Sequence, residues 1–306
     1  MKIAFIGGVK FSYELLKHIL ENGWSVSVVF SYDNSKKKFY SDFISFSDLT
    51  KKYGINHIKV NNINDEENIS LLRNIKPDLI LVMGWSQLLK KEIIEIPKFG
   101  VIGSHPTELP KYRGRSPIPW SVLKGLDESA LTFFLIEEGV DNGDIVAQRK
   151  FKITSEDDAT SIYEKIISVG KEMLLETLAL IEKGQVKRFK QNPEKFIENW
   201  PKRTPEDGKI DWSKSGKEIH TLIRATTYPY PGAFTFFKES KLIIWKALYS
   251  NEKSDGVGKI MDISKEGLKV GTGKGVVILQ IVNQNGNIQV ESSKIFPRDN
   301  IGSILG

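Results

Sequence analysis

The chain has 306 residues, 40% of them apolar, which is enough to bury one large core and a second, smaller one. It contains no cysteine, and this excludes a disulfide framework, a thiolate metal site and a thiol nucleophile. The net charge is +6 and the pI is about 9.1, but the charge is spread out and lysine runs such as Lys36–Lys38 lie near Asp and Glu, which favours a solvated surface over a dedicated nucleic-acid patch.

The first eight residues, MKIAFIGG, form a short apolar run that ends too early for a signal sequence and reads as a β-strand. No stretch approaches the roughly 20 consecutive apolar residues that a membrane span requires. The sequence therefore predicts a soluble, cytoplasmic protein without a membrane partner.

Up to about residue 105, strand-like apolar runs alternate with helix-like stretches, a pattern typical of a parallel sheet covered by helices. The predicted strands are Lys2–Ile6, Ser25–Phe30, His57–Val60, Leu79–Met83 and Val101–Ser104. The predicted helices are Tyr13–Asn22, Phe46–Tyr53, Asn68–Ile75 and Lys91–Ile96. The pattern indicates a doubly wound, Rossmann-like α/β fold, so ligands should bind beyond the carboxyl ends of the strands, at the loops after Ile6, Met83 and Ser104.

Two more strands, Ala130–Ile136 and Ile145–Phe151, and a long amphipathic helix, Ala159–Lys183, follow. Beyond a polar, proline-bearing stretch, one short helix precedes short β-patterned runs separated by glycines. These elements are Lys217–Ala225, Ala233–Phe237, Lys241–Ala247, Gly258–Ile263, Gly267–Gly271 and Val276–Val282. Such spacing suits a small β-barrel. We predict a catalytic domain over residues 1–192, a linker over 193–208 and an OB-like β-barrel domain over 209–306.

One candidate for chemistry is His105, at the end of a predicted strand. Pro106 forces the residue before it into an extended conformation, so the imidazole should project into the crevice. A proline-rich loop follows, with Arg113 and Arg115 on either side of Gly114. A histidine at a strand end can equally serve as a structural hydrogen-bonding group, so this segment alone leaves its role open.

A second candidate segment is Glu137–Asp144, which follows a strand and carries several acids around Gly139 and Gly143. Asp-Asn-Gly is also ordinary turn chemistry, because Asp and Asn side chains bond their own backbone and glycine tolerates positive φ. Taken alone, the segment reads as a turn.

Together, the two segments resemble the 10-formyltetrahydrofolate-dependent formyltransferases, and the resemblance covers nearly the whole chain. The shared motifs are His-Pro-x-x-Leu-Pro-x-x-Arg-Gly from His105 and, about 25 residues later, Gly-Val-Asp-x-Gly-Asp-Ile from Gly139. The family includes methionyl-tRNA formyltransferase and the sugar-nucleotide N-formyltransferases. The resemblance assigns catalysis to His105 and Asp141, whereas the asparagine of the family's Asn-x-His triplet falls on Gly103 and is missing.

The resemblance implies direct transfer of a formyl group from the co-substrate 10-formyltetrahydrofolate to a primary amine, without a metal. His105 would stabilise negative charge on the formyl oxygen, and Asp141 would favour the protonated imidazole and accept a proton from the amine. Loss of one oxyanion donor costs roughly 10²–10³ in rate. With glycine at position 103, Ser104, Asn142, a backbone amide or a water would have to replace that donor.

The resemblance also indicates which residues hold the folate: backbone groups before the histidine strand and before the aspartate, together with apolar walls that suit a flat ring. These residues are Met83, Gly84, Trp85, Ile102, Leu109, Glu137, Gly139 and Val140. Each apolar one reads equally well as plain core packing.

The first loop, with Gly8, Lys10 and Ser12, lies between a strand and a helix, where backbone N–H groups attract anions such as a diphosphate. It is not a Gly-x-Gly-x-x-Gly fingerprint, which disfavours a nicotinamide cofactor. We assign these three residues, with Arg113 and Arg115, to substrate binding.

Three stretches resemble the enzyme that formylates UDP-4-amino-4-deoxy-L-arabinose: Asp33–Tyr40, Tyr112–Pro117, and Lys202–Gly208 leading into Ile210–Trp212 and Pro229–Phe234. The tRNA enzyme instead carries a longer basic insertion after its second strand, which residues 31–45 do not match. We therefore rank an amino-deoxysugar nucleotide, linked to UDP or dTDP and used in lipopolysaccharide biosynthesis, first as acceptor. Methionyl-tRNA is the alternative, because that enzyme shares the small C-terminal β-barrel. The 16 Lys and Arg against 11 Asp and Glu in residues 201–306 are compatible with RNA but too mild and unpatterned to establish it. Formyl-folate hydrolysis and a non-catalytic binding module remain open, as does pairing into a homodimer.

Overall fold

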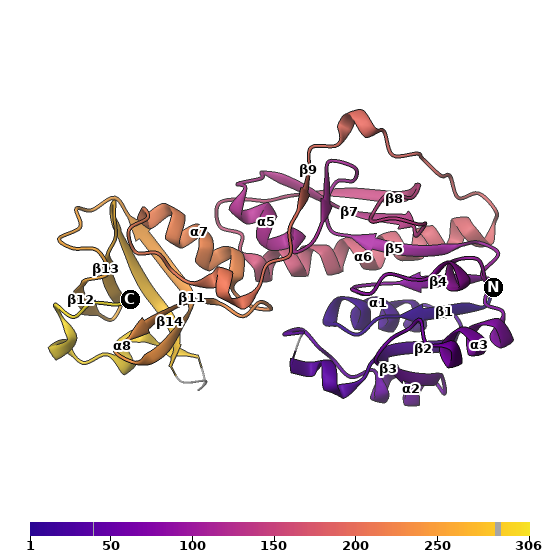
Figure 1. Ribbon diagram of the computed structural model, residues 1–306, viewed down its shortest axis with the longest axis horizontal. Coiled ribbons are helices and arrows are strands. Elements are labelled where there is room, and N and C mark those ends of the chain that lie inside the picture. The colour runs from indigo at the N-terminus through magenta and orange to yellow at the C-terminus, as the bar shows by residue number, and fades with distance from the viewer. Residues whose placement is uncertain (39, 285–288) are drawn as a thin grey trace. The chain divides into compact units, whose positions relative to one another are not determined.

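The computed structural model of the protein, drawn in Figure 1, describes residues 1–38, 40–284 and 289–306. Phe39, in one of the sugar-branch stretches, lies outside the described residues. The chain divides into two compact units: unit 1 contains residues 1–117, 127–153 and 163–201, and unit 2 contains residues 118–126, 154–162 and 202–306. This division differs from the expected one, because two short internal stretches group with the C-terminal part.

Unit 1 is built on a seven-stranded sheet in the order β3-β2-β1-β4-β5-β7-β8. Its strands are β1 (Ile3–Ile6), β2 (Val26–Tyr32), β3 (Asn56–Val60), β4 (Leu79–Val82), β5 (Val101–His105), β7 (Glu128–Leu135) and β8 (Ile145–Lys152). The first five are parallel, and β7 and β8 are antiparallel to their neighbours. Every residue of the central strands β1 and β4 is buried, as expected for a sheet covered on both faces.

The helices of this part of the chain are α1 (Lys10–Glu21), α2 (Ser47–Lys52), α3 (Glu66–Ile75), α4 (Lys91–Ile94) and α6 (Ala159–Glu182), with 3₁₀ turns η1 (Asn34–Lys38) and η2 (Pro193–Lys195). Helix α1 buries Phe11, Leu15 and Ile19, whose spacing of four residues forms one apolar stripe. It begins three residues before the predicted start, because the Ser12 hydroxyl accepts hydrogen bonds from the amides of Gly8 and Val9.

The predicted linker is not a free connection over its whole length. Strand β9 (Glu198–Trp200) pairs in parallel with β6 (Tyr112–Gly114), and Trp200 is 2% exposed. The Trp200 ring stacks on that of Tyr112, with centroids 4.7 Å apart. The chain after α6 is therefore part of unit 1 up to Pro201, and it packs on the loop that follows His105.

Unit 2 contains a six-stranded antiparallel sheet in the order β10-β11-β14-β13-β12, with β15 paired to β14. Its strands are β10 (Ala233–Phe237), β11 (Ser240–Ser250), β12 (Ile260–Ser264), β13 (Gly267–Gly271), β14 (Val276–Gln284) and β15 (Val290–Glu291). Its helical elements are α7 (Gly216–Thr226), α8 (Ser292–Ile295), η3 (Pro205–Gly208), η4 (Arg298–Asn300) and, apart from its first residue, α5 (Pro117–Leu123). The predicted fold class, a Rossmann-like sheet with a C-terminal barrel-like domain, is confirmed. Among the described residues, no helix is long and apolar enough to cross a membrane.

Candidate functional site

The two residues that the motifs single out lie together at the carboxyl end of β5. Nδ1 of His105 is 3.6 Å from Oδ2 of Asp141, and their side chains are 7% and 18% exposed. His105 is the last residue of β5 and pairs with Thr132 on the neighbouring antiparallel strand, so it is held by the sheet itself. A buried imidazole beside a partly exposed carboxylate is an arrangement suited to proton transfer.

The hydrogen bonds of His105 determine which ring nitrogen carries the proton. Nε2 lies 3.1 Å from the carbonyl oxygen of Tyr112. Because a carbonyl can only accept a hydrogen bond, Nε2 must be the protonated nitrogen, and in the neutral ring Nδ1 then holds a lone pair. The hydroxyl of Thr107 donates to the same carbonyl at 2.5 Å, and Thr107 is fully buried. Sequence reasoning missed Thr107, because it occupies a variable position of the His-Pro-x-x-Leu-Pro motif.

The protein environment lowers the pKa of His105 below its ordinary value. Burial, which disfavours the charged ring, is the largest cause, while the negative charge of Asp141 and the Tyr112 carbonyl act in the opposite direction. The predicted effect of Asp141, support of the protonated ring, is present but is outweighed by burial. The direction of this shift favours the neutral ring, in which Nδ1 faces the carboxylate.

Asp141 lies in a tight turn that presents its carboxylate to the imidazole. Its φ is +52°, a left-handed conformation that Asp tolerates better than most residues, and its Oδ2 accepts a hydrogen bond from the Gly114 amide at 3.1 Å. Gly143 closes the turn so tightly that a Cβ there would lie 1.8 Å from the Leu135 carbonyl oxygen. The two predicted motifs are thus joined by a backbone-to-carboxylate hydrogen bond.

The position of the missing asparagine is filled by an apolar side chain. A Cβ on Gly103 would lie 2.9 Å from Cγ1 and 3.0 Å from Cδ1 of Ile136. Because residues alternate along a strand, Ser104 faces the opposite side of β5 from Gly103 and His105. The structure therefore does not bring the Ser104 hydroxyl to the imidazole, and Asn142 instead donates to the Glu138 carbonyl at 3.1 Å.

The residues assigned to the folate divide into two groups. Met83, Ile102 and Leu109 are at most 2% exposed and belong to the packed interior. Trp85 is half-buried and stacks on Tyr32, with ring centroids 3.8 Å apart. Gly84 has φ +58° beside them, whereas Glu137, Gly139 and Val140 form an exposed loop that leads to Asp141. This loop leads directly to Asp141.

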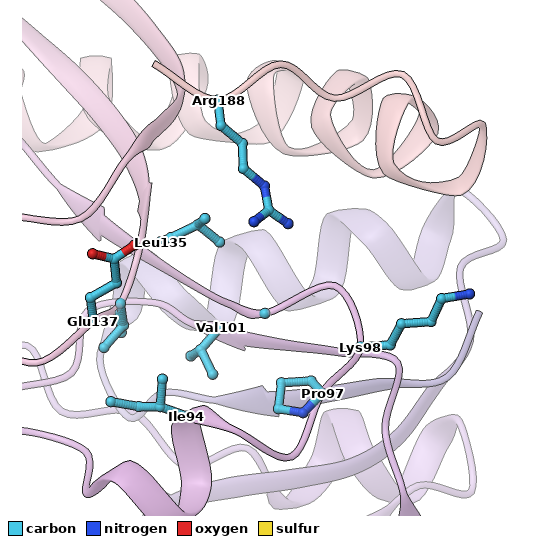
Figure 2. Close-up of a pocket in the computed structure, with 9 residues that line it drawn as sticks. Ile94, Pro97, Lys98, Val101, Leu135, Glu137 and Arg188 are labelled. Carbon is cyan, nitrogen blue, oxygen red and sulfur yellow. The ribbon is translucent and has the colours of Figure 1, made fainter. Parts of the chain in front are cut away.

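A cavity of about 200 Å³ lies beside the same loop (Figure 2). The residues that line it are Ile94, Pro97, Lys98, Gly100, Val101, Leu135, Ile136, Glu137 and Arg188. Figure 2 shows Arg188 and Leu135 on one side of the cavity and Ile94 and Pro97 on the other. The cavity shares Ile136 with the wall that covers Gly103, two residues before His105. Its apolar walls and charged rim suit one flat ring system with polar edges rather than a whole folate.

The first loop does not offer free donors in the way the sequence suggested. The amides of Gly8 and Val9 both donate to Oγ of Ser12 at 3.0 Å. The amide of Lys10 donates to the Asp42 carbonyl, and its ammonium forms an ion pair with Glu164 at 2.5 Å. A phosphate could bind here only if these bonds were replaced, so binding by Gly8, Lys10 and Ser12 stays a prediction.

Of the two arginines assigned to the substrate, Arg113 is half-buried and Arg115 is exposed. Arg113 donates to the side chain of Gln191 and lies over the ring of Phe196, with Cζ 5.7 Å from the ring centroid. Within the part of the chain that the structure describes, no group of three or more His, Asp or Glu side chains is placed to hold a metal ion.

Comparison with known proteins gives matches over both units. A family model described as "Formyl transferase" matches residues 1–178, and one described as "Formyl transferase, C-terminal domain" matches residues 202–299. Methionyl-tRNA formyltransferase of Clostridioides difficile (strain 630) is 35% identical over 294 residues, which is 92% of this chain and 91% of that protein.

Two solved structures share the fold at low sequence identity. HypX from Aquifex aeolicus, in complex with tetrahydrofolic acid, has a TM-score of 0.71 at 21% identity. That match covers 96% of this chain but 46% of HypX, so the chain spans less than half of that protein. An N-formyltransferase from Helicobacter canadensis, in complex with folinic acid and dTDP-3-aminofucose, has a TM-score of 0.68 at 22% identity and covers 92% of this chain and 99% of that one.

Proposed function

This chain belongs to the formyl transferase family, and we propose that it moves a formyl group from 10-formyltetrahydrofolate to a primary amine at the His105–Asp141 pair. The observation that carries the proposal is the 3.6 Å approach of His105 Nδ1 to Asp141 Oδ2 at the carboxyl end of β5. Ligands of doubly wound sheets bind at this edge.

When bound, the reduced folate supplies the electrophilic formyl carbon. The Tyr112 carbonyl keeps the ring proton of His105 on Nε2, so Nδ1 is free to accept a proton from the attacking amine, directly or through Asp141. The carboxylate then stabilises the resulting imidazolium, which can return the proton to the departing nitrogen. In this arrangement Nε2–H of the protonated ring bonds the Tyr112 carbonyl and Nδ1–H faces Asp141, so negative charge on the carbonyl oxygen would be stabilised by another donor, a backbone amide or a water.

We place the ring system of the folate between the loop after β4 and the loop that leads to Asp141, as the family resemblance implies. Gly84 and Trp85 follow the carboxyl end of β4, the strand that pairs with β5, and Glu137–Val140 lead to Asp141. The cavity of Figure 2 is lined by Gly100 and Val101 at the amino end of β5, about 13 Å along the strand from His105 at roughly 3.3 Å per residue. It therefore lies away from this edge, and we do not assign the folate to it.

For the acceptor, the support is strongest for methionyl-tRNA, the alternative of the sequence analysis. The Clostridioides difficile protein, named as a methionyl-tRNA formyltransferase, matches almost the whole of both chains. Residues 201–306 carry a net charge of +5, which would favour a polyanionic acceptor.

The second candidate acceptor is an amino-deoxysugar nucleotide. The Helicobacter canadensis enzyme, whose structure contains dTDP-3-aminofucose, has the same fold over 99% of its length. The stretches within 33–40, 112–117 and 202–234 that resemble the sugar branch are the features of the chain itself that favour a sugar nucleotide.

The two acceptors are separated by incubating the protein with 10-formyltetrahydrofolate and either methionyl-tRNA or a panel of UDP- and dTDP-linked amino sugars. Transfer to tRNA alone would exclude the sugar nucleotide, and transfer to a sugar alone would exclude tRNA. Folate turnover without any amine would identify a hydrolase. His105→Asn and Asp141→Asn should each reduce transfer by about 10²–10⁴-fold with unchanged circular dichroism, whereas His18→Gln on α1 serves as a control outside the site. Full activity in either site variant would overturn the proposal.

A further inference from the structure

Gln191 connects three parts of the candidate site, although neither motif includes it. It lies in the segment between α6 and β9, and its side chain is half-buried. The amide oxygen accepts hydrogen bonds from Nη2 of Arg113 at 2.7 Å and from its Nε at 3.3 Å. The amide nitrogen donates to the carbonyls of Asp141 and Gly143, both at 2.8 Å. The amide oxygen therefore accepts two hydrogen bonds and the amide nitrogen donates two, which is the full number for this side chain.

The two carbonyls that Gln191 binds bracket Asn142, at the tip of the turn that carries the catalytic carboxylate. Asp141 adopts a left-handed conformation in this turn, which costs a non-glycine residue about 1 kcal/mol or more. The neighbouring Val140 and Asn142 are exposed, so little packing holds the turn from outside. A donor that reaches both carbonyls at once favours this conformation over others.

We propose that Gln191 is a positioning residue: its amide holds the Asp141 turn in the conformation that keeps the carboxylate 3.6 Å from the imidazole of His105. This role rests on the proposed function, in which the pair carries the proton. Gln191 does not touch the reacting atoms, and it acts through Asp141. The same amide also binds the guanidinium of Arg113, which the sequence analysis assigns to the substrate. The Gln191 side chain thus fixes the position of the Asp141 turn relative to Arg113.

Two variants separate the two ends of the amide. Gln191→Ala removes both interactions, whereas Gln191→Glu keeps an oxygen acceptor for Arg113 but cannot donate to the carbonyls of Asp141 and Gly143. If Gln191 acts through the turn, both variants lose about 10- to 100-fold in kcat, because a displacement of about 1 Å at a catalytic group can cost that much. Gln185→Ala, an exposed glutamine of the same segment, is the matched control.

A measurement without turnover tests the same geometry. The chain contains four histidines, so the His105 signal can be assigned by NMR through the His105→Gln variant. In Gln191→Ala the Asp141 charge moves away, and the His105 titration midpoint should fall relative to the wild type. This readout stands even if no tested amine is formylated, so it distinguishes failure of this inference from failure of the proposed function.

Wild-type kcat in Gln191→Ala would overturn the inference, and so would an unchanged His105 titration. Full activity in Gln191→Glu would also overturn it, because it would show that Gln191 acts through Arg113 alone. If the alanine variant does not fold, the glutamate variant, which has nearly the same volume, carries the test.

Discussion

His105 is held by groups that act on its protonation in opposite directions. Burial lowers its pKa, and the Asp141 charge and the Tyr112 carbonyl raise it, with burial dominant. We therefore expect the NMR titration of His105 to have a midpoint below the ordinary value of about 6.5. Asp141→Asn removes one of the two opposing causes, so the midpoint should fall further. A midpoint above 6.5 in the wild type, or a rise in the variant, would contradict this account of the site.

Ile136 and Gly103 form a complementary pair in which the larger side chain fills the space that the glycine leaves. Gly103→Asn alone should lower the free energy of unfolding by about 1–3 kcal/mol, because the added atoms would overlap with Ile136. Combining it with Ile136→Ala should relieve that overlap. Urea denaturation measures both, and Ile136→Ala alone is the control for the cavity that this change creates. Undiminished stability of the single variant would show that Ile136 moves aside freely.

The double variant also tests the missing donor. If an amide beside His105 stabilises the carbonyl oxygen, Gly103→Asn with Ile136→Ala should show a higher kcat than Ile136→Ala alone. Equal rates would indicate that this stabilisation does not require an amide at position 103.

At the scale of single elements, the start of α7 is fixed by a capping box. The amide and hydroxyl of Ser215 donate to Oε2 of Glu218 at 2.9 and 2.7 Å, and the Glu218 amide donates back to the Ser215 hydroxyl at 3.3 Å. Ser215→Ala should destabilise unit 2 by about 1 kcal/mol, measured by thermal unfolding. Lys217→Ala, at an exposed position of the same helix, is the comparison. An equal loss in both variants would argue against a specific role of the cap.

Elements with a strong local signal were predictable from the sequence. The buried run Leu79–Val82 and the alternating run Ala233–Phe237 were identified within one residue of their observed bounds. The three-residue strands β6 and β9 were not, because each exists only through pairing with a partner more than 80 residues away. Strand β9 and its buried Trp200 lie within the segment that was predicted to be a linker.

The same distinction applies to the candidate site. His105 and Asp141 were assigned from the resemblance of their two motifs to a family, because each motif alone left the role of its residue open. Gln191 and Ile136 reach the site through the fold, from positions whose sequence context is ordinary for a polar loop and for a strand end. Contacts between residues far apart in the sequence depend on tertiary packing, which cannot be read from a single sequence.

At the scale of the whole molecule, unit 2 is assembled from three separate stretches of chain. The two internal stretches contribute the buried residues Ile118, Val122 and Ile162. The Arg203 guanidinium lies 5.1 Å from the centroid of the Trp120 ring, and Thr160 donates to the Tyr228 carbonyl at 2.5 Å. Residues 118–126 and 154–162 therefore each contact residues beyond 201.

A fragment that ends at residue 201 should therefore unfold at a lower temperature than the full chain and bind a dye for exposed apolar surface. Calorimetry and dye fluorescence, compared with the intact protein, measure both effects. A fragment with the melting temperature of the full chain would show that the internal stretches do not need the remainder of unit 2.

The three-part composition of unit 2 also bears on how the protein is made. When residue 126 has been synthesised, Arg203 is still about 77 residues further along the chain, and at about 5–20 residues per second its synthesis takes on the order of ten seconds. During that interval the Trp120 ring lacks the guanidinium that lies over it in the folded protein. Residues 118–126 can therefore complete their contacts in unit 2 only after the later stretch has been made.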